Sequence, residues 1–80
     1  MKAQREEIGK AIADNIRAER NRANLSQENV ANQLGITLRT YVTYEQNAKN
    51  VEATTLILLS KILECDVNDF YLHTKSTKCE

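Results

Sequence analysis

Residues 26–47 read SQENVANQLGITLRTYVTYEQN and contain two short helical patterns separated by a single glycine, with no proline. Ser26 is a good N-cap, because its hydroxyl can accept a hydrogen bond from a backbone N–H at the start of a helix. Gly35 can take a positive φ without a Cβ clash, so it can end this helix sharply. Thr37 caps a second helix, which we expect to end at Asn47. The chain can therefore turn within about three or four residues.

Two helices joined in this way cross at a large angle, which is the helix-turn-helix arrangement. The crossing needs a small residue where the two backbones approach, and Ala31 lies four residues before the glycine. It also needs apolar residues on the inner faces, which are Val30, Leu34, Ile36, Tyr41 and Tyr44. The outer face of the second helix then carries Leu38, Arg39, Val42 and Thr43.

The rest of the chain shows helical periodicity and almost no strand signal. We expect helices over residues 4–23, 53–64 and 67–73, the last capped by Asp66. The expected inward positions are Ile8, Ile12 and Ile16 in residues 4–23, Leu56, Leu59, Ser60 and Leu63 in residues 53–64, and Val67 and Phe70 in residues 67–73. The sequence predicts an all-α, compact five-helix domain over residues 1–73, followed by a flexible tail at 74–80.

The composition limits the classes of function. Eighty residues make one domain, and equal numbers of basic and acidic residues give zero formal net charge. A zero net charge argues weakly against a nucleic-acid partner, since phosphate binders usually carry a basic excess. The charge is unevenly spread, however: residues 1–50 carry eight Lys or Arg against six Asp or Glu, and residues 51–80 carry three against five. The basic half is the half that holds the helix-turn-helix.

We expect no metal and no cofactor. Cys65, Cys79 and His73 are too few to close a zinc site, which takes four ligands. We interpret Cys65 as a small core residue and Cys79 as a free thiol, which fits a reducing cytoplasm. No apolar run approaches the length of a membrane span, and no leader pattern begins the chain. The sequence therefore predicts a cytoplasmic protein without a membrane partner.

The motifs together resemble the Cro and phage-repressor helix-turn-helix family, that is, the lambda-repressor-like DNA-binding domains. The resemblance runs over residues 12–72. It is carried by Leu25-Ser26-Gln27 at the start of the helix that Ser26 caps, by Ala31 and Gly35, by Tyr44-Glu45, by the leucine-rich stretch ATTLILLSKIL and by CDVNDF at 65–70. The chain departs from the family where Asn24 and Asn47 replace glycines that end helices, and we expect both to be left-handed. It also departs at Tyr41, which replaces a β-branched aliphatic residue, at Leu38, which replaces a polar one, and at Val51 and Glu52, which replace a proline and a small cap.

The resemblance implies a role for particular residues. The base-reading residues would be Leu38, Arg39, Val42 and Thr43, and the phosphate-contacting residues would be Gln27, Thr40, Gln46, Lys49 and Asn50. Leu38 could pack on a thymine methyl in place of a hydrogen bond. Arg20, late in the helix over residues 4–23, would form a structural ion pair with Glu45 in the helix that Thr37 caps. This pair lacks the neighbouring nucleophile or second carboxylate that catalysis would need, so we expect no enzyme.

The LILL run at 56–59 leaves two interpretations open. It could be a generously apolar core helix, or Ile57 and Leu58 could point outward and, with Tyr71 and Leu72, form a dimer interface. We expect a sequence-specific DNA-binding transcriptional regulator, a repressor or controller that acts as a homodimer on a palindromic operator of double-stranded DNA. The alternative is a protein-interaction module on the same fold, either antitoxin-like or an anti-repressor. The sequence shows no small-molecule site.

Overall fold

The computed structural model describes residues 2–71, which form four α-helices and a short 3₁₀ helix. The elements are α1 (Lys2–Arg22), α2 (Gln27–Leu34), α3 (Leu38–Gln46), α4 (Ala53–Ile62) and η1 (Val67–Phe70). Residues 2–71 contain no strand, so the prediction of an all-α fold is confirmed. The fifth element is a 3₁₀ helix in place of the expected α-helix. The predictions for Leu72, His73, Cys79 and the 74–80 tail lie outside the described residues.

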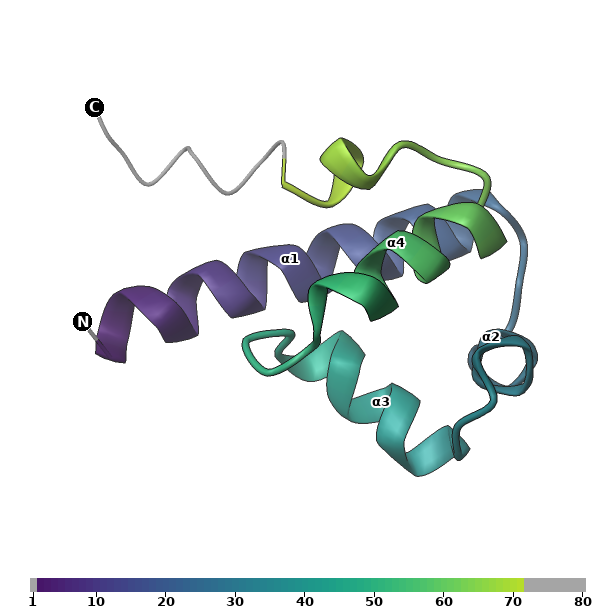
Figure 1. Ribbon diagram of the computed structural model, residues 1–80, viewed down its shortest axis with the longest axis horizontal. Coiled ribbons are helices and arrows are strands. Elements are labelled where there is room, and N and C mark those ends of the chain that lie inside the picture. Colours follow the sequence, from purple (N-terminus) through teal and green to yellow (C-terminus); the bar gives the residue numbers. More distant parts are fainter. Residues whose placement is uncertain (1, 72–80) are drawn as a thin grey trace.

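The helices surround a core in which α3 packs on α1 and α2 to the same extent. Helix α1 packs on α3 and η1, α2 packs on α3 and α4, and α4 also packs on η1. Figure 1 shows α2 almost end-on while α3 runs across the view, so the two helices cross at a large angle. Within residues 2–71 no helix combines the length and the apolar character that crossing a bilayer would require.

The turn between α2 and α3 follows from local chemistry. The backbone N–H of Asn29 donates to Ser26 Oγ at 3.0 Å, and that of Thr40 donates to Thr37 Oγ1 at 3.2 Å, so both expected N-caps are in place. Gly35 has φ 76°, while an added Cβ would meet no atom within 4 Å. The left-handed backbone, and not a lack of space, is therefore the reason for glycine here.

The other helix ends agree only in part with the sequence. Asn24 is left-handed, at φ 62°, as predicted. The same prediction for Asn47 is wrong, since its φ is −161°, which is extended backbone. The physical reason is tertiary, because the Asn47 side chain is hydrogen-bonded between α1 and the segment that follows α3. Glu52 makes no side-chain cap on α4, and α4 ends at Ile62, two residues before the expected end, with Glu64 left-handed at φ 56°.

The core holds most of the inward positions that periodicity indicates. Its buried apolar residues are Ile12, Ala13, Ile16, Val30, Ala31, Tyr41, Ala48, Leu56, Leu59, Leu63 and Phe70. Ile8 is exposed, so the apolar stripe of α1 enters the core only from Ile12 onward. Buried Asn15 was not foreseen, and its Nδ2 donates to the carbonyl of Phe70 at 2.7 Å. This hydrogen bond fastens η1 to α1.

Candidate nucleic-acid interface

The outer face of α3 presents the four residues expected to read bases. Leu38, Arg39 and Thr43 are exposed and Val42 is half-buried. Arg39 makes no hydrogen bond or ion pair with any residue in the described part of the chain. Its guanidinium, with five N–H donors in a planar fork, therefore stands ready for an external acceptor.

Two threonines on the same helix use their hydroxyls locally. The Oγ1 of Thr43 donates to the carbonyl of Thr40 at 2.5 Å. The side chain of Thr40 is exposed and lies 3.0 Å from Thr37 Oγ1, oxygen to oxygen. Because the Thr43 hydroxyl donates its proton to the helix backbone, this side chain offers a ligand its two acceptor lone pairs and its methyl group.

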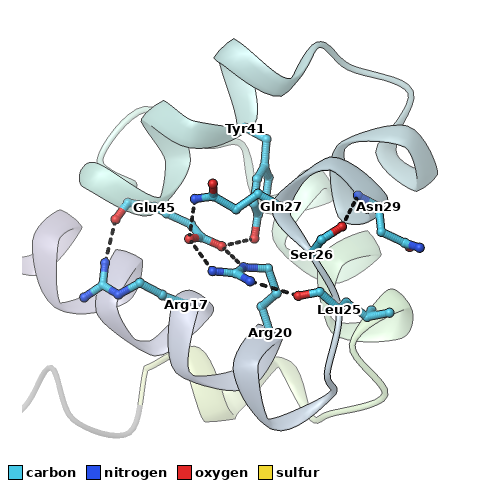
Figure 2. A network of polar contacts seen from close by, with 8 residues as sticks. All are labelled: Arg17, Arg20, Leu25, Ser26, Gln27, Asn29, Tyr41 and Glu45. Carbon is cyan, nitrogen blue, oxygen red and sulfur yellow. Dashed lines mark hydrogen bonds and ion pairs between the residues drawn. The ribbon is translucent and has the colours of Figure 1, made fainter.

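A buried carboxylate ties α3 to α1 (Figure 2). Glu45 Oε2 lies 2.6 Å from Arg20 Nε, and Glu45 Oε1 lies 3.2 Å from Arg20 Nη2, so the two side chains meet as a fork on a fork. The Tyr41 hydroxyl donates to Oε2 at 2.5 Å, and the Gln27 amide donates to Oε1 at 3.0 Å. Glu45 thus accepts hydrogen bonds from residues of α1, α2 and α3.

These contacts set the charge states of the cluster. Burial alone would raise the pKa of Glu45, but hydrogen bonds from Arg20, Tyr41 and Gln27 outweigh it and hold that pKa below its ordinary 4.5. The pKa of Arg20 is raised, chiefly by its hydrogen bond to Glu45. Burial and the hydrogen bond to Glu45 raise the pKa of Tyr41, so its phenol stays protonated as a donor. At neutral pH the cluster is an ion pair with neutral donors around it.

Arg17 and Arg20 also hold backbone carbonyls beside this cluster. Arg17 Nη1 donates to the carbonyl of Glu45 at 3.0 Å, and Arg20 Nη1 donates to that of Leu25 at 2.8 Å. The hydrogen bonds from Tyr41, Gln27 and Arg17 to Glu45 were missed from the sequence. Tyr41 and Glu45 are four residues apart on one helix, a spacing that places side chains on the same face and could have indicated the first of them.

The residues expected along a phosphate backbone fall at the two ends of this arrangement. Gln27 begins α2 and is half-buried through its contact with Glu45. Gln46, the last residue of α3, and Asn50, which follows the helix, are both exposed. Lys49 is exposed too, but its Nζ lies 2.5 Å from Glu6 Oε2 on α1. Gln27 and Lys49 are therefore already engaged within the protein.

Comparison with known proteins identifies the architecture. A helix-turn-helix family model matches residues 16–70, which include the whole of α2, α3, α4 and η1. The chain belongs to the helix-turn-helix family. In its terms α3 is the second helix of the motif, and the Glu45 cluster lies where the two motif helices meet α1.

Two curated relatives agree with this family. The chain is 42% identical over 62 residues to control protein C.SmaI of Serratia marcescens, a match that covers 76% of this chain and 73% of the relative. It is 33% identical over 67 residues to the uncharacterized HTH-type transcriptional regulator YqaE of Bacillus subtilis (strain 168), covering 84% of this chain and 57% of the relative. No solved structure matches. The relatives are a control protein and a regulator, so the expectation that this helix-turn-helix protein is not an enzyme is confirmed.

One grouping of possible metal ligands lies away from the helix-turn-helix. Atoms of Glu19, Cys65 and Asp69 lie within 4.8 Å of one another. Arg22 Nε already lies 2.6 Å from Glu19 Oε1, and burial, with the nearby carboxylates, raises the pKa of Cys65 to about 11. A protonated thiol beside a paired carboxylate is a poor cation site, so we assign no metal to it.

Several apolar side chains are exposed outside the two motif helices, on α4 and after η1. Ile57 is 48% and Leu58 43% exposed, which does not fit the interpretation of the LILL run as wholly core. Tyr71 is also exposed, while Leu72 is outside the described residues. A shallow groove of about 460 Å³ runs nearby between α1 and α4, lined in part by Ile8, Val51 and Tyr71.

Proposed function

We propose that this protein is a sequence-specific DNA-binding transcriptional regulator, a repressor or controller that binds a palindromic operator as a homodimer. The observation that supports it most is the outer face of α3, where Arg39 is exposed and has no partner within residues 2–71. The second helix of such a motif lies in the major groove of the duplex. The Glu45 cluster would hold α3 at a fixed angle for that task.

The base-reading set in this proposal is Leu38, Arg39, Val42 and Thr43. Arginine to guanine O6 and N7 is the commonest specific contact in the major groove. Leu38 would contact a thymine methyl, because it brings no hydrogen-bonding group. Thr43 would accept a hydrogen bond or contact a methyl group, since its hydroxyl proton is bound to the Thr40 carbonyl.

The phosphate-contacting set is Gln27, Thr40, Gln46, Lys49 and Asn50, which flank the outer face of α3. Contacts to phosphate fix the position of a protein on the duplex without reading its sequence. Gln27 lies at the start of α2, where backbone N–H groups favour an anion. The formal net charge of zero means that these local contacts must supply the attraction.

The homodimer is proposed from energetics and from exposed apolar surface. One motif makes few contacts, and two copies bound at half-sites about 10 bp apart, or a multiple of this, double them. Ile57, Leu58, Tyr71 and Leu72 form the proposed interface. Of these, Ile57 and Leu58 lie on α4, outside the two motif helices, and they and Tyr71 are exposed. The similarity to a control protein makes a controller the favoured kind of regulator. The expected location is the cytoplasm.

Selection of bound duplexes from a random DNA pool, with salt titrated, tests the function. We expect enrichment of one palindromic sequence and a steep loss of affinity as salt rises, because phosphate contacts release counterions. The zero net charge favours one competing function, a protein-interaction module on the same fold. Failure to enrich any duplex at low salt would favour that module.

A further inference from the structure

The segment that follows α3 rests on the first turns of α1. The backbone N–H of Ala48 donates to the carbonyl of Gly9 at 2.9 Å, and Asn47 Nδ2 donates to the carbonyl of Glu6 at 3.1 Å. Ala48 is buried in the contact. Figure 1 shows the loop between α3 and α4 beneath the amino-terminal half of α1. This part of α1 precedes residues 16–70, which match the family model.

Gly9 allows the two backbones to come this close. A Cβ built on Gly9 would lie 2.1 Å from Asn47 Oδ1 and 2.7 Å from the backbone nitrogen of Lys49. Both separations are shorter than any stable non-bonded contact between such atoms. Glycine in the middle of a helix is otherwise less favourable than alanine, so the close approach accounts for its presence.

The same contact brings Lys49 to a carboxylate. Asn47 Oδ1 accepts the backbone N–H of Lys49 at 3.0 Å, which directs the chain toward α1. The Lys49 ammonium then lies 2.5 Å from Glu6 Oε2, and these side chains are 31% and 52% exposed, respectively. Glu7, the next residue, is exposed and makes no hydrogen bond or ion pair within residues 2–71.

We propose that Glu6 competes with DNA phosphate for the Lys49 ammonium and so limits the affinity for DNA without changing the preferred sequence. The inference rests on the proposed function, because it takes the 47–50 segment to lie along the phosphate backbone. A phosphate that binds Lys49 must displace the Glu6 carboxylate or accept a like charge beside it. Either event weakens binding to every sequence alike, since phosphates carry no sequence information.

A cycle of variants isolates this competition. Glu6→Gln and Glu7→Gln remove the same charge from adjacent exposed positions, so Glu7→Gln controls for net charge. Each is made in the wild-type protein and in Lys49→Ala, and Kd is measured for the selected operator and for an unrelated duplex. Thermal melts verify that all six proteins fold.

We expect Glu6→Gln to bind both duplexes about two- to fivefold more tightly per protein copy than Glu7→Gln, the range for an exposed ion pair. The advantage should vanish in Lys49→Ala and should shrink as salt screens the charges. Equal effects of the two substitutions, or an advantage that persists without Lys49, would overturn the inference. A changed preferred sequence would overturn it as well. If the wild-type protein enriches no duplex, the proposed function fails first and takes the inference with it. If the wild-type protein does enrich a duplex but Glu6→Gln and Glu7→Gln bind it equally, only the proposed competition by Glu6 is refuted.

Discussion

At the scale of single residues, Arg39 carries the largest part of the proposed specificity. Its guanidinium is exposed on α3 and has no partner within the described residues, so truncation should leave the fold intact. Arg39→Ala should cost about 1 to 3 kcal/mol at one base pair and relax the preference there. Binding to a panel of single-base operator variants measures this.

Gln27→Ala and Lys49→Ala are the matched comparison for Arg39→Ala. Phosphate contacts position the protein, so both should weaken all operator variants about equally. If Arg39→Ala keeps the full base preference, Arg39 is not a base-reading residue. A shifted preference in either comparison variant would contradict its assignment to phosphate.

Removal of one partner of the Arg20–Glu45 ion pair should strongly lower the stability of the fold. The side chains are only 12% and 3% exposed, so a truncation strands a charge in a nearly dry site. Arg20→Met and Glu45→Gln should each cost about 3 to 5 kcal/mol, and the double mutant much less than their sum. Chemical unfolding of the three proteins measures the coupling. Additive losses would show that the two groups do not interact energetically.

The same cluster predicts an acid-dependent loss of stability. The pKa of Glu45 is lowered in the fold, so the unfolded chain takes up this proton first as pH falls. The contribution is complete above the ordinary pKa of 4.5 that applies in the unfolded chain, and is lost as pH falls through the lower folded pKa. Melts between neutral pH and pH 2 should show this loss in the wild-type protein and a flatter profile in Glu45→Gln. Parallel profiles would exclude Glu45 as the titrating group.

At the scale of elements, the stability of Gly9→Ala tests whether helix propensity or the tertiary contact at Gly9 has the larger effect. Helix propensity alone would make Gly9→Ala more stable by about 0.5 to 1 kcal/mol. The contact predicts the opposite, because a Cβ would lie 2.7 Å from the backbone nitrogen of Lys49. We expect a lower melting temperature. Adding Asn47→Ala should not restore the melting temperature, since the clash with the Lys49 backbone remains and the two hydrogen bonds of the Asn47 side chain are lost. A higher melting temperature would show that the segment can move aside without loss.

The features that could be predicted from the sequence are those set by local chemistry, and the features that could not are set by tertiary packing. The α2 and α3 boundaries rest on Ser26, Gly35 and Thr37, whose roles are local and were therefore visible in the sequence. Asn47 was wrongly predicted to be left-handed because its backbone is set by hydrogen bonds with distant α1. The pairing of Lys49 with Glu6 was invisible for the same reason, as 43 residues separate them in the chain.

The candidate site shows the same limit. The outer face of α3 follows from helical periodicity once the turn is known, so its residues were predictable as a set. The freedom of Arg39 and the engagement of Gln27 with Glu45 depend on which neighbours the fold supplies. Periodicity places a side chain on a face, but it does not say what that side chain touches there.

At the scale of the whole molecule, the exposed apolar surface of α4 should determine assembly. A chain of 80 residues has a marginal core, and burial between two copies adds stability that rises with concentration. Leu58→Glu places a charge at the centre of the proposed interface, where a dimer would have to desolvate it. We expect a folded monomer that binds the operator much more weakly.

Asn21→Glu is the control for this last experiment, because it adds the same charge at an exposed position on α1. It should remain dimeric and lose only the small affinity that one added negative charge removes. Sedimentation of the free proteins and of their complexes with operator DNA distinguishes the cases. Helical content by circular dichroism separates a dissociated dimer from an unfolded chain. A wild-type protein that stays monomeric at high concentration, and binds one copy per palindromic duplex, would refute the dimer while leaving the assignment of α3 intact.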